Sequence, residues 1–171
     1  MTTIEMKRVE RADLAILENL LQFYLYDFSI YFCDDPEEQI GQDGRFPTWF
    51  DIARYVEEEN FWAYLARIQG RLAGFALISD RMRLRDAPGR FVDEFFVLRC
   101  ERRKGIGTAL AHQVFNTYRG YWEITEVMGN TPAQAFWREA VRRYTRGRFR
   151  DFIQEEDGVE YAWQTFDSSQ W

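Results

Sequence analysis

The sequence predicts a single α/β domain with a mixed, mostly antiparallel sheet flanked by helices. Three observations lead to this fold class. Runs with β-sheet composition alternate with helical runs in the order β α α β β β α β α β β. Residues 61–70 and 71–80 are two such β runs joined at Gln69-Gly70, the composition of a hairpin turn. The strand-like "FVDEFFVL" leads directly into the glycine-bearing "RRKGIGTAL", so a helix is expected to follow a strand there.

The first third of the chain predicts one strand and two helices. Residues 3–10 alternate apolar and polar side chains, which indicates a strand. Residues 11–32 predict an amphipathic helix capped by Asp13, because apolar side chains recur every three or four positions, at Leu14, Leu17, Leu21, Leu25 and Phe28. Proline and glycine among acidic residues indicate a loop over 34–47, and a shorter helix is expected over 48–60.

The remaining elements follow the same rules. After the hairpin, an arginine-rich loop with Pro-Gly is expected over 81–90, followed by a strand that ends at Leu98. The glycines then begin a helix that continues to about Tyr118, and Pro132 suits the first turn of a helix that continues to about Tyr144. Strands are predicted at 121–127, 147–155 and 159–167, the last two around a turn at Asp157-Gly158.

Composition limits the possible functions. A chain of 171 residues, 46% hydrophobic and 18% aromatic, suits one globular domain rather than a disordered chain. It contains no run of about 20 uncharged apolar residues, and its first residues lack the apolar segment of a signal peptide. We therefore expect a cytoplasmic protein with no membrane partner.

Charge and cysteine content limit the partners further. The net charge of −6 argues against nucleic acid as a partner. Cys33, Cys100 and the single His112 have no spacing typical of a metal site, so no metal is expected.

The junction at residues 102–108 has the composition of an anion-binding corner. Glycines allow the backbone to approach a ligand, and the free N–H groups at the start of a helix attract phosphate. Its pattern, R-x-x-G-x-G, is neither the dinucleotide fingerprint nor the P-loop. A pyrophosphate site is one interpretation. The other is that Gly105 and Gly107 only shape a turn.

Two segments resemble a known family. "VDEFFVLRCERRKGIGTAL" at 92–110 resembles the acetyl-CoA-binding segment of the GNAT superfamily of N-acetyltransferases, and "NTPAQAFW" at 130–137 resembles its N-x-x-A-x-x-F-Y segment. More narrowly, "FYLYDFS", "EFFVLRCERRKGIG", "NTPAQAFW" and "QTFD" resemble a family of small bacterial predicted acetyltransferases. The resemblance implies a GNAT-like fold in which the strand ending at Leu98 and strand 121–127 are parallel neighbours that splay apart to hold acetyl-CoA.

The resemblance also implies roles for individual residues. The pyrophosphate would be held by backbone amides around Arg102, Arg103, Lys104, Gly105, Ile106, Gly107 and Thr108. The pantetheine arm would pair with the strand edge at Phe96, Val97 and Leu98, and the Val97 N–H would polarise the thioester carbonyl. Asn130 would contact the cofactor side of the cleft, with Phe136 packed beside it.

The reaction itself points to Asp93 and Glu94. An amine with a pKa near ~10.4 must lose a proton before it attacks a thioester, and a carboxylate can accept that proton. Neighbours on a strand face opposite sides, so Asp93 is expected beside Phe95 and Val97, and Glu94 beside Phe96 and Leu98, unless a bulge intervenes. The alternative is a structural carboxylate paired with Arg81, Arg83 or Arg85.

One position departs from the family pattern. Trp137 stands where the superfamily often has a tyrosine that protonates the departing thiolate, and an indole cannot act as that acid. Tyr144, Tyr118 or Tyr121 could substitute, or the thiolate could leave unaided, since its thiol has a pKa near ~8.5. This departure also leaves open a non-catalytic acyl-CoA-binding module.

The resemblance further implies that the acceptor binds at the first helix and the loop after it. Tyr24, Tyr26, Asp27 and Tyr31 lie in an acidic, aromatic stretch whose composition suits a small cationic amine. The alternative for this stretch is a solvated acidic loop. A homodimer is also plausible for so aromatic a domain.

Overall fold

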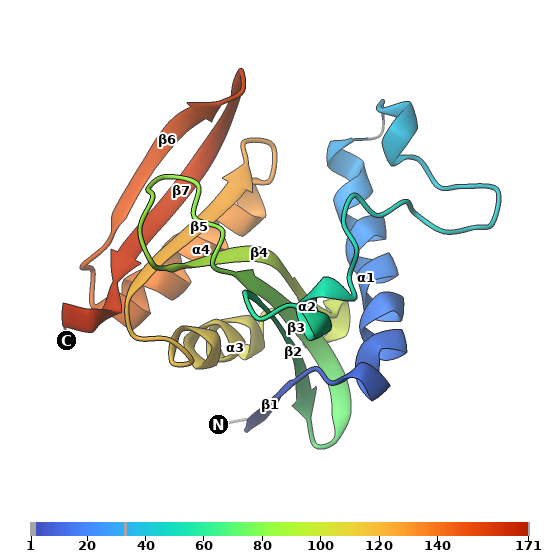
Figure 1. Ribbon diagram of the computed structural model, residues 1–171, viewed down its shortest axis with the longest axis horizontal. Coiled ribbons are helices and arrows are strands. Elements are labelled where there is room, and N and C mark those ends of the chain that lie inside the picture. Colours follow the sequence, from blue (N-terminus) through green and yellow to red (C-terminus); the bar gives the residue numbers. More distant parts are fainter. Residues whose placement is uncertain (1–2, 33, 171) are drawn as a thin grey trace.

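The computed structural model describes residues 3–32 and 34–170, so Cys33 lies outside the described residues. In that part of the chain, seven strands form one sheet in the order β1-β2-β3-β4-β5-β7-β6 (Figure 1). The strands are β1 (Ile4–Arg8), β2 (Phe61–Ile68), β3 (Arg71–Ser79), β4 (Arg90–Val97), β5 (Tyr121–Val127), β6 (Arg150–Glu156) and β7 (Val159–Asp167). The predicted α/β fold with a mixed, mostly antiparallel sheet is confirmed.

Helices cover both faces of the sheet. They are α1 (Leu14–Phe28), the single turn α2 (Arg54–Glu57), α3 (Ile106–Phe115) and α4 (Thr131–Thr145). Leucines of α1 pack with Tyr55 of α2 on one face, where the buried side chains include Phe75, Leu77 and Phe96. On the other face α3 and α4 pack over an aromatic core that includes Trp122, Trp137 and Phe166. The predicted amphipathic character of these helices follows from this arrangement.

Three predicted helices are shorter than expected. The helix expected over 11–32 is α1, Leu14–Phe28, with a single 3₁₀ turn before and after it. Residues 48–60 contain only α2, because tertiary contacts rather than helical hydrogen bonds hold the segment: Ile52 is buried and the Trp49, Phe50 and Tyr55 rings pack in series. The helix expected to reach Tyr118 ends at Phe115, where the Thr117 hydroxyl donates to the Val114 carbonyl at 2.7 Å and ends the helical ladder.

β4 and β5 are parallel neighbours for only a short distance. Their register joins Arg90 to Trp122, Phe91 to Glu123 and Val92 to Ile124, and all other strand pairs are antiparallel. Beyond Val92 the ribbons of β4 and β5 diverge, and α1 lies on the far side of the opening from β5–β7 (Figure 1). The expected parallel pair and its splay are both present.

Candidate functional site

A β-bulge brings Asp93 and Glu94 to the same face of the sheet. Leu77 of β3 pairs with Glu94 and the next residue, Ile78, pairs with Val92, so Asp93 is the extra residue. Such a bulge interrupts the strict alternation of side chains along a strand. The expectation that Asp93 faces the same side as Phe95 and Val97 is therefore wrong. Both carboxyl groups face α1 and α2.

The Asp93 carboxyl group is half-buried beside two hydroxyl groups. The Ser79 hydroxyl donates to its Oδ1 at 3.0 Å, whereas Oδ2 is buried and has no hydrogen-bond partner among the described residues. Burial raises the pKa of Asp93 to about 7, although the Ser79 and Tyr55 hydroxyls and the charges of Arg81 and Arg54 favour the ionised form. At neutral pH this group can therefore exchange a proton.

Glu94 occupies a similar environment one residue further along β4. The Tyr24 hydroxyl of α1 donates to its Oε2 in a short hydrogen bond. Burial raises the pKa of Glu94 to about 8, the hydrogen bond from Tyr24 lowers it, and the charge of Asp93 raises it further. Neither carboxylate is in an ion pair with a described residue. Of the arginines weighed as partners, Arg83 pairs with Glu156 and Arg85 lies over the Tyr121 ring at 3.5 Å.

The opening between β4 and β5 exposes backbone groups of Val97. The Leu98 N–H donates to the Ala73 carbonyl of β3 at 2.8 Å. Since the direction of these groups alternates along an antiparallel strand, Val97 directs its N–H and C=O away from β3, towards the side where β5 has diverged. The Val97 carbonyl accepts from Arg102 Nε at 2.7 Å. The Val97 N–H therefore faces the opening.

The junction between β4 and α3 forms a turn that leaves helical amides available. Gly105 precedes the helix with φ of 80°, and Arg103 also has a positive φ of 61°. The Ala109 N–H donates to the Gly105 carbonyl at 3.0 Å, so the amides of Ile106, Gly107 and Thr108 precede the first helical bond. A Cβ atom at Gly105 would meet no described atom within 4 Å. The corner thus fits the phosphate group predicted for it.

The Arg102 side chain does not point along these amides. Its guanidinium pairs with Asp27 of α1, and Arg99 pairs with the same carboxylate at 2.7 Å. The sequence predicts that Asp27 contacts a cationic acceptor, but its carboxylate already holds two arginines. It ties the end of α1 to the turn that follows β4.

The start of α4 lies close to the end of α1. Asn130 caps α4 by accepting from the Ala133 N–H at 3.2 Å, and its Oδ1 also accepts from the Tyr31 hydroxyl at 3.0 Å. The Phe136 ring stacks on Phe95 of β4, with centroids 5.6 Å apart. A Cβ atom at Gly107 would lie 3.0 Å from the Phe136 ring. These contacts place Phe136 against β4 and Asn130 against the turn that follows α1.

Trp137 is a core residue. It is 5% exposed and packs edge-on against Phe95 and Phe136, with Phe115 also in contact. The tyrosines weighed as replacement acids lie elsewhere: the Tyr144 hydroxyl donates to Asn116, Tyr118 packs on Trp122, and Tyr121 lies under Arg85. The tyrosine hydroxyl that reaches α4 at its start belongs to Tyr31.

Comparison with known proteins agrees with this architecture. The family described as "Acetyltransferase (GNAT) family" matches residues 20–141, more than half of the chain. The chain belongs to this acetyltransferase family. The predicted family and enzyme class are thereby confirmed. A search of curated proteins gives no match.

Solved structures share the fold of this acetyltransferase at low identity. An acetyltransferase from Thermus thermophilus is 17% identical with a TM-score of 0.65, and the alignment covers 98% of this chain and 99% of that one. The GNAT domain of S. lividans PAT is 15% identical with a TM-score of 0.66, covering 96% and 90%. The aminoglycoside acetyltransferase AAC(6′)-Ib, in complex with coenzyme A and kanamycin, is 14% identical with a TM-score of 0.62, covering 96% and 95%.

Two residues near Asp93 were not predicted from the sequence, because they lie outside the sequence motifs. Tyr55 and Ser79 flank Asp93, but neither lies in a motif of the sequence, and only the paired register of β3 and the position of α2 bring them there. Of the predicted acceptor residues, Tyr24 contacts Glu94 and Tyr31 contacts Asn130, whereas Tyr26 is 62% exposed and packs on Phe46.

Within the described ranges, 3–32 and 34–170, no group of three or more histidine, cysteine or acidic side chains is arranged to hold a metal ion. No helix in the described part of the chain is long and apolar enough to cross a membrane.

Proposed function

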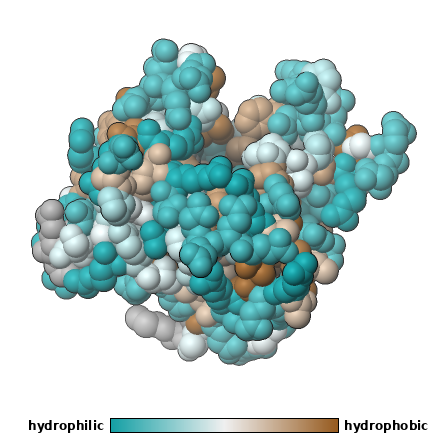
Figure 2. Space-filling model, in the orientation of Figure 1, coloured by the Kyte–Doolittle hydropathy of each residue, from teal (hydrophilic) through white to brown (hydrophobic). Residues whose placement is uncertain are grey.

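We propose that this acetyltransferase moves the acetyl group of acetyl-CoA to a primary amine of a small cationic acceptor, by direct attack of the amine. One observation carries the proposal. Because of the bulge in β4, the carboxyl groups of Asp93 and Glu94, both with raised pKa values, lie on one face of the strand, beside the opening that the Val97 N–H faces. Figure 2 shows a notch between two lobes of the surface, and Figure 1 shows that these lobes belong to β5–β7 and to α1 with its following loop.

The residues of the opening fit acetyl-CoA. The amides of Ile106, Gly107 and Thr108 would hold the pyrophosphate at the positive end of the α3 dipole. The edge of β4 at Phe96, Val97 and Leu98 would hold the pantetheine arm, with Asn130 and Phe136 on the opposite wall. The cofactor supplies an acetyl group activated as a thioester. The coenzyme A bound in the structure of AAC(6′)-Ib, which shares this fold, supports the assignment.

Asp93 and Glu94 would act on the acceptor amine. A protonated amine cannot attack, and a base with a pKa near the working pH accepts its proton most effectively. The pKa values of about 7 and 8 place both groups in that range. The Val97 N–H would donate to the thioester carbonyl oxygen as negative charge develops there.

The leaving thiolate needs no acid from Trp137. The buried indole cannot supply a proton, and a thiol with a pKa near ~8.5 leaves readily as its anion.

Two structures with this fold support a small amine as the acceptor. AAC(6′)-Ib forms a complex with coenzyme A and kanamycin. AAC(6′)-Iy forms a complex with the bisubstrate analogue CoA-S-monomethyl-acetylneamine. The fold therefore accommodates amine-bearing acceptors in those proteins, and the support for this chain is at the level of fold.

Substitution at Gly107 tests the cofactor site. Gly107→Glu puts a negative side chain among the amides of α3, so we expect acetyl-CoA binding measured by calorimetry to be lost. Gly107→Ala is the matched control: it makes the same contact with Phe136 without the charge, and we expect its affinity to fall by about tenfold or less. Unchanged affinity in Gly107→Glu would show that the loop is only a turn.

An amine panel separates catalysis from binding alone. Thiol release from acetyl-CoA is followed with each amine in turn, and the product mass is checked. We expect turnover above hydrolysis with at least one small cationic amine. Cofactor binding with no turnover across the panel would favour the acyl-CoA-binding module instead.

A further inference from the structure

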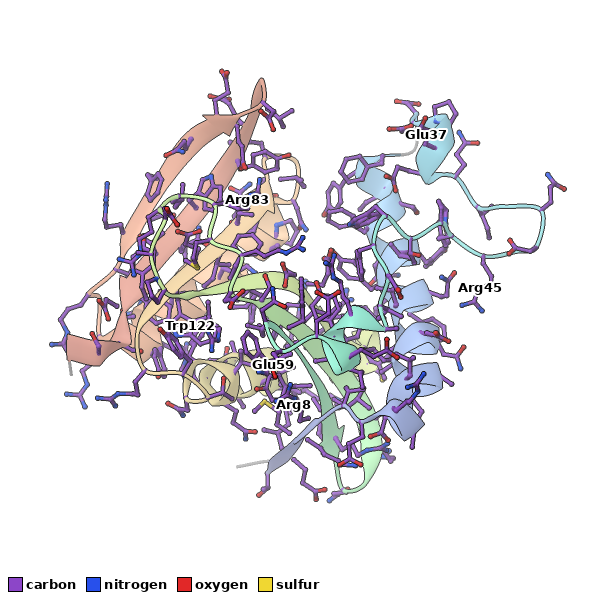
Figure 3. All side chains as sticks on the ribbon, viewed as in Figure 1. Arg8, Glu37, Arg45, Glu59, Arg83 and Trp122 are labelled. Carbon is purple, nitrogen blue, oxygen red and sulfur yellow. The ribbon has the colours of Figure 1, made fainter. Side chains whose placement is uncertain are left out.

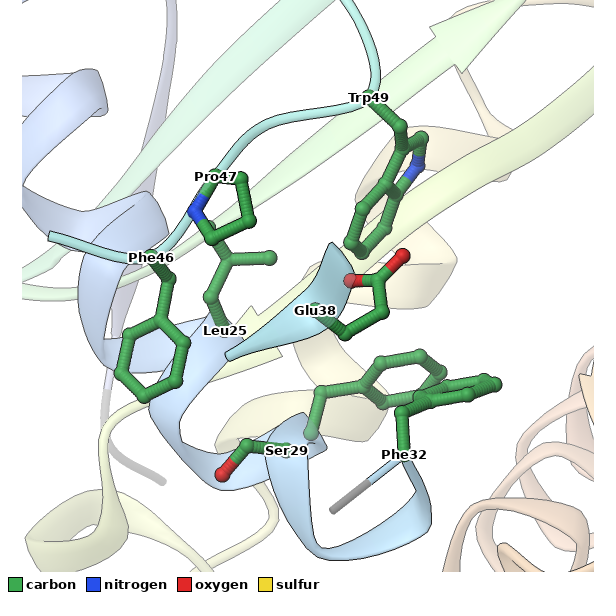
Figure 4. A pocket seen from close by; sticks show the side chains of 8 residues that line it. Leu25, Ser29, Phe32, Glu38, Phe46, Pro47 and Trp49 are labelled. Carbon is green, nitrogen blue, oxygen red and sulfur yellow. The ribbon is translucent and has the colours of Figure 1, made fainter. Parts of the chain in front are cut away.

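A recess in the lobe of α1 combines aromatic walls with one carboxylate. It lies between the end of α1 and the loop that follows, and Figure 4 shows the Glu38 carboxyl group between the Trp49 and Phe32 side chains. The lining residues are Leu25, Phe28, Ser29, Phe32, Glu38, Phe46, Pro47 and Trp49. Trp49 is half exposed, so the recess is open to solvent.

The contacts around this recess fix its walls. The Phe28 ring packs 5.2 Å from Phe32 and 6.5 Å from Trp49, centroid to centroid. Gln22 holds the Phe46 backbone by two hydrogen bonds, accepting from its N–H at 2.8 Å and donating to its carbonyl at 3.2 Å. Contacts within the protein therefore hold the aromatic side chains that line the recess.

Glu38 has no partner of opposite charge there. Its carboxylate makes no hydrogen bond or ion pair with any described residue. Burial raises the pKa of Glu38, and the neighbouring charges of Asp35 and Glu37 raise it further. Aromatic faces are negative and do not favour a carboxylate, whereas a cation is attracted both to the rings and to the carboxylate. A cation would therefore be attracted to this recess.

The enclosed part of the recess is small. Its volume of about 10 Å³ is at the lower limit for holding one water molecule. A primary ammonium group is similar in size to a water molecule, so it is the organic cation that enters this space with the least movement of the walls.

The Tyr24 ring connects the recess to Glu94. Phe28 stacks on Tyr24 with centroids 5.4 Å apart, and the Tyr24 hydroxyl donates to Glu94. We propose that the recess binds a second, protonated amine of the acceptor, so that the acceptor is a diamine held by Glu38 at one end and acetylated beside Asp93 and Glu94 at the other. This inference rests on the proposed function, since it assigns the acceptor of the same site.

Binding without the acetyl donor tests the recess independently of catalysis. Linear α,ω-diaminoalkanes of two to six carbons are titrated into the protein by calorimetry, beside n-alkylamines of the same lengths. We expect the longer diamines to bind at least about tenfold more tightly than the matched monoamines. 1,2-Diaminoethane should show no such advantage. Its nitrogens are closer together than the centroids of the Phe28 and Tyr24 rings, which lie between the recess and Glu94.

Two variants in the turn at residues 36–38 test whether Glu38 causes the tighter binding of diamines. Glu38→Gln should abolish the advantage of diamines, and Glu37→Gln, which removes the same charge from an exposed neighbour, should retain it. Equal affinities for diamines and monoamines, or equal losses in the two variants, would overturn the proposal.

Transfer assays keep the two proposals apart. If diamines bind through Glu38 but release no thiol, the recess stands and the proposed function fails. If monoamines are acetylated as efficiently as diamines, and Glu38→Gln changes neither kcat nor KM, the proposed function stands and the recess assignment fails.

Discussion

Two groups of raised-pKa carboxyls lie on opposite faces of the same sheet. Asp93 and Glu94 face α1, are half-buried, and have pKa values of about 7 and 8. Glu126 of β5 lies on the α4 face, is 6% exposed, and has a pKa of about 8. Burial is the main cause in all three. A raised pKa alone therefore does not distinguish a catalytic group from a structural one.

The two groups of carboxyls differ in their exposure to the opening and in their neighbouring side chains. The pair on β4 has tyrosine hydroxyls beside it and lies next to strand edges that β5 leaves unpaired. Glu126 is enclosed, and its side chain accepts from Gln164 Nε2 at 3.4 Å, while Glu126 Oε1 and Gln164 Oε1 lack partners among the described residues. A protonated Glu126 supplies a donor to a cluster that has too many acceptors.

The two lobes also differ in how their charged side chains are paired. Figure 3 places Arg83 on the side of β5–β7 and Glu37 at the tip of the opposite lobe. The Arg83 guanidinium pairs with Glu156 and lies 5.1 Å from the centroid of Trp163, and the Glu123 carboxylate accepts from the Arg83 N–H at 2.8 Å. In the lobe of β5–β7, the charge of Arg83 is paired with that of Glu156. In the lobe of α1, the Glu38 carboxylate has no ion pair with a described residue.

Neutralising Asp93 and Glu94, the proposed catalytic pair, should have the largest effect. Asp93→Asn and Glu94→Gln each remove a proton acceptor, so we expect at least one of them to lower kcat at pH 7 by about 10²–10⁴-fold. Acetyl-CoA affinity should stay unchanged, because neither side chain lies at the α3 amides. The measurement is steady-state thiol release together with calorimetry.

Glu126→Gln is the matched control for that experiment. It changes a carboxyl group with a similarly raised pKa on the opposite face, and it should leave kcat within about twofold of the parent. If Glu126→Gln lowers kcat as much as Asp93→Asn and Glu94→Gln do, the distinction between the two faces is wrong.

The same Glu126→Gln variant should change stability. The folded-state pKa of Glu126 lies above its unfolded value, so its stabilising contribution is complete below about pH 4.5 and is lost as the pH rises through about 8. Glutamine stays neutral, so we expect the variant to be more stable than the parent by about 1–3 kcal/mol at pH 8.5, with little difference at pH 4. Urea unfolding at both pH values measures this, and a variant less stable at pH 8.5 would contradict it.

The smallest expected effect concerns the Tyr24 hydroxyl. Its hydrogen bond favours ionised Glu94, so Tyr24→Phe should raise the Glu94 pKa further and reduce kcat/KM at pH 7 by about tenfold or less. Activity should recover as the pH is raised, which shifts the rising limb of the pH profile to higher pH. Tyr26→Phe removes an exposed hydroxyl from the same helix and should leave the profile in place. Superimposable profiles for the two variants would remove Tyr24 from the mechanism.

Much of the fold could be predicted from local patterns. The leucine spacing of α1, the hairpin at Gln69-Gly70 and the turn at Gly105 depend on neighbouring residues, so composition and periodicity identify them. The short α2 could not be predicted in this way, because packing of Trp49, Phe50 and Tyr55 outweighs the helical pattern of 48–60.

The sequence by itself determined the family, the sheet with its parallel pair, and the candidate turn for the cofactor, because those depend on contiguous motifs. Only the tertiary structure decided the rest. The bulge that puts Asp93 and Glu94 on one face depends on the register of β3. The pairing of Asp27 with Arg99 and Arg102, and the recess at Glu38, depend on how α1 packs against β4 and the following loop. Contacts between residues far apart in the chain leave no local pattern from which to predict them.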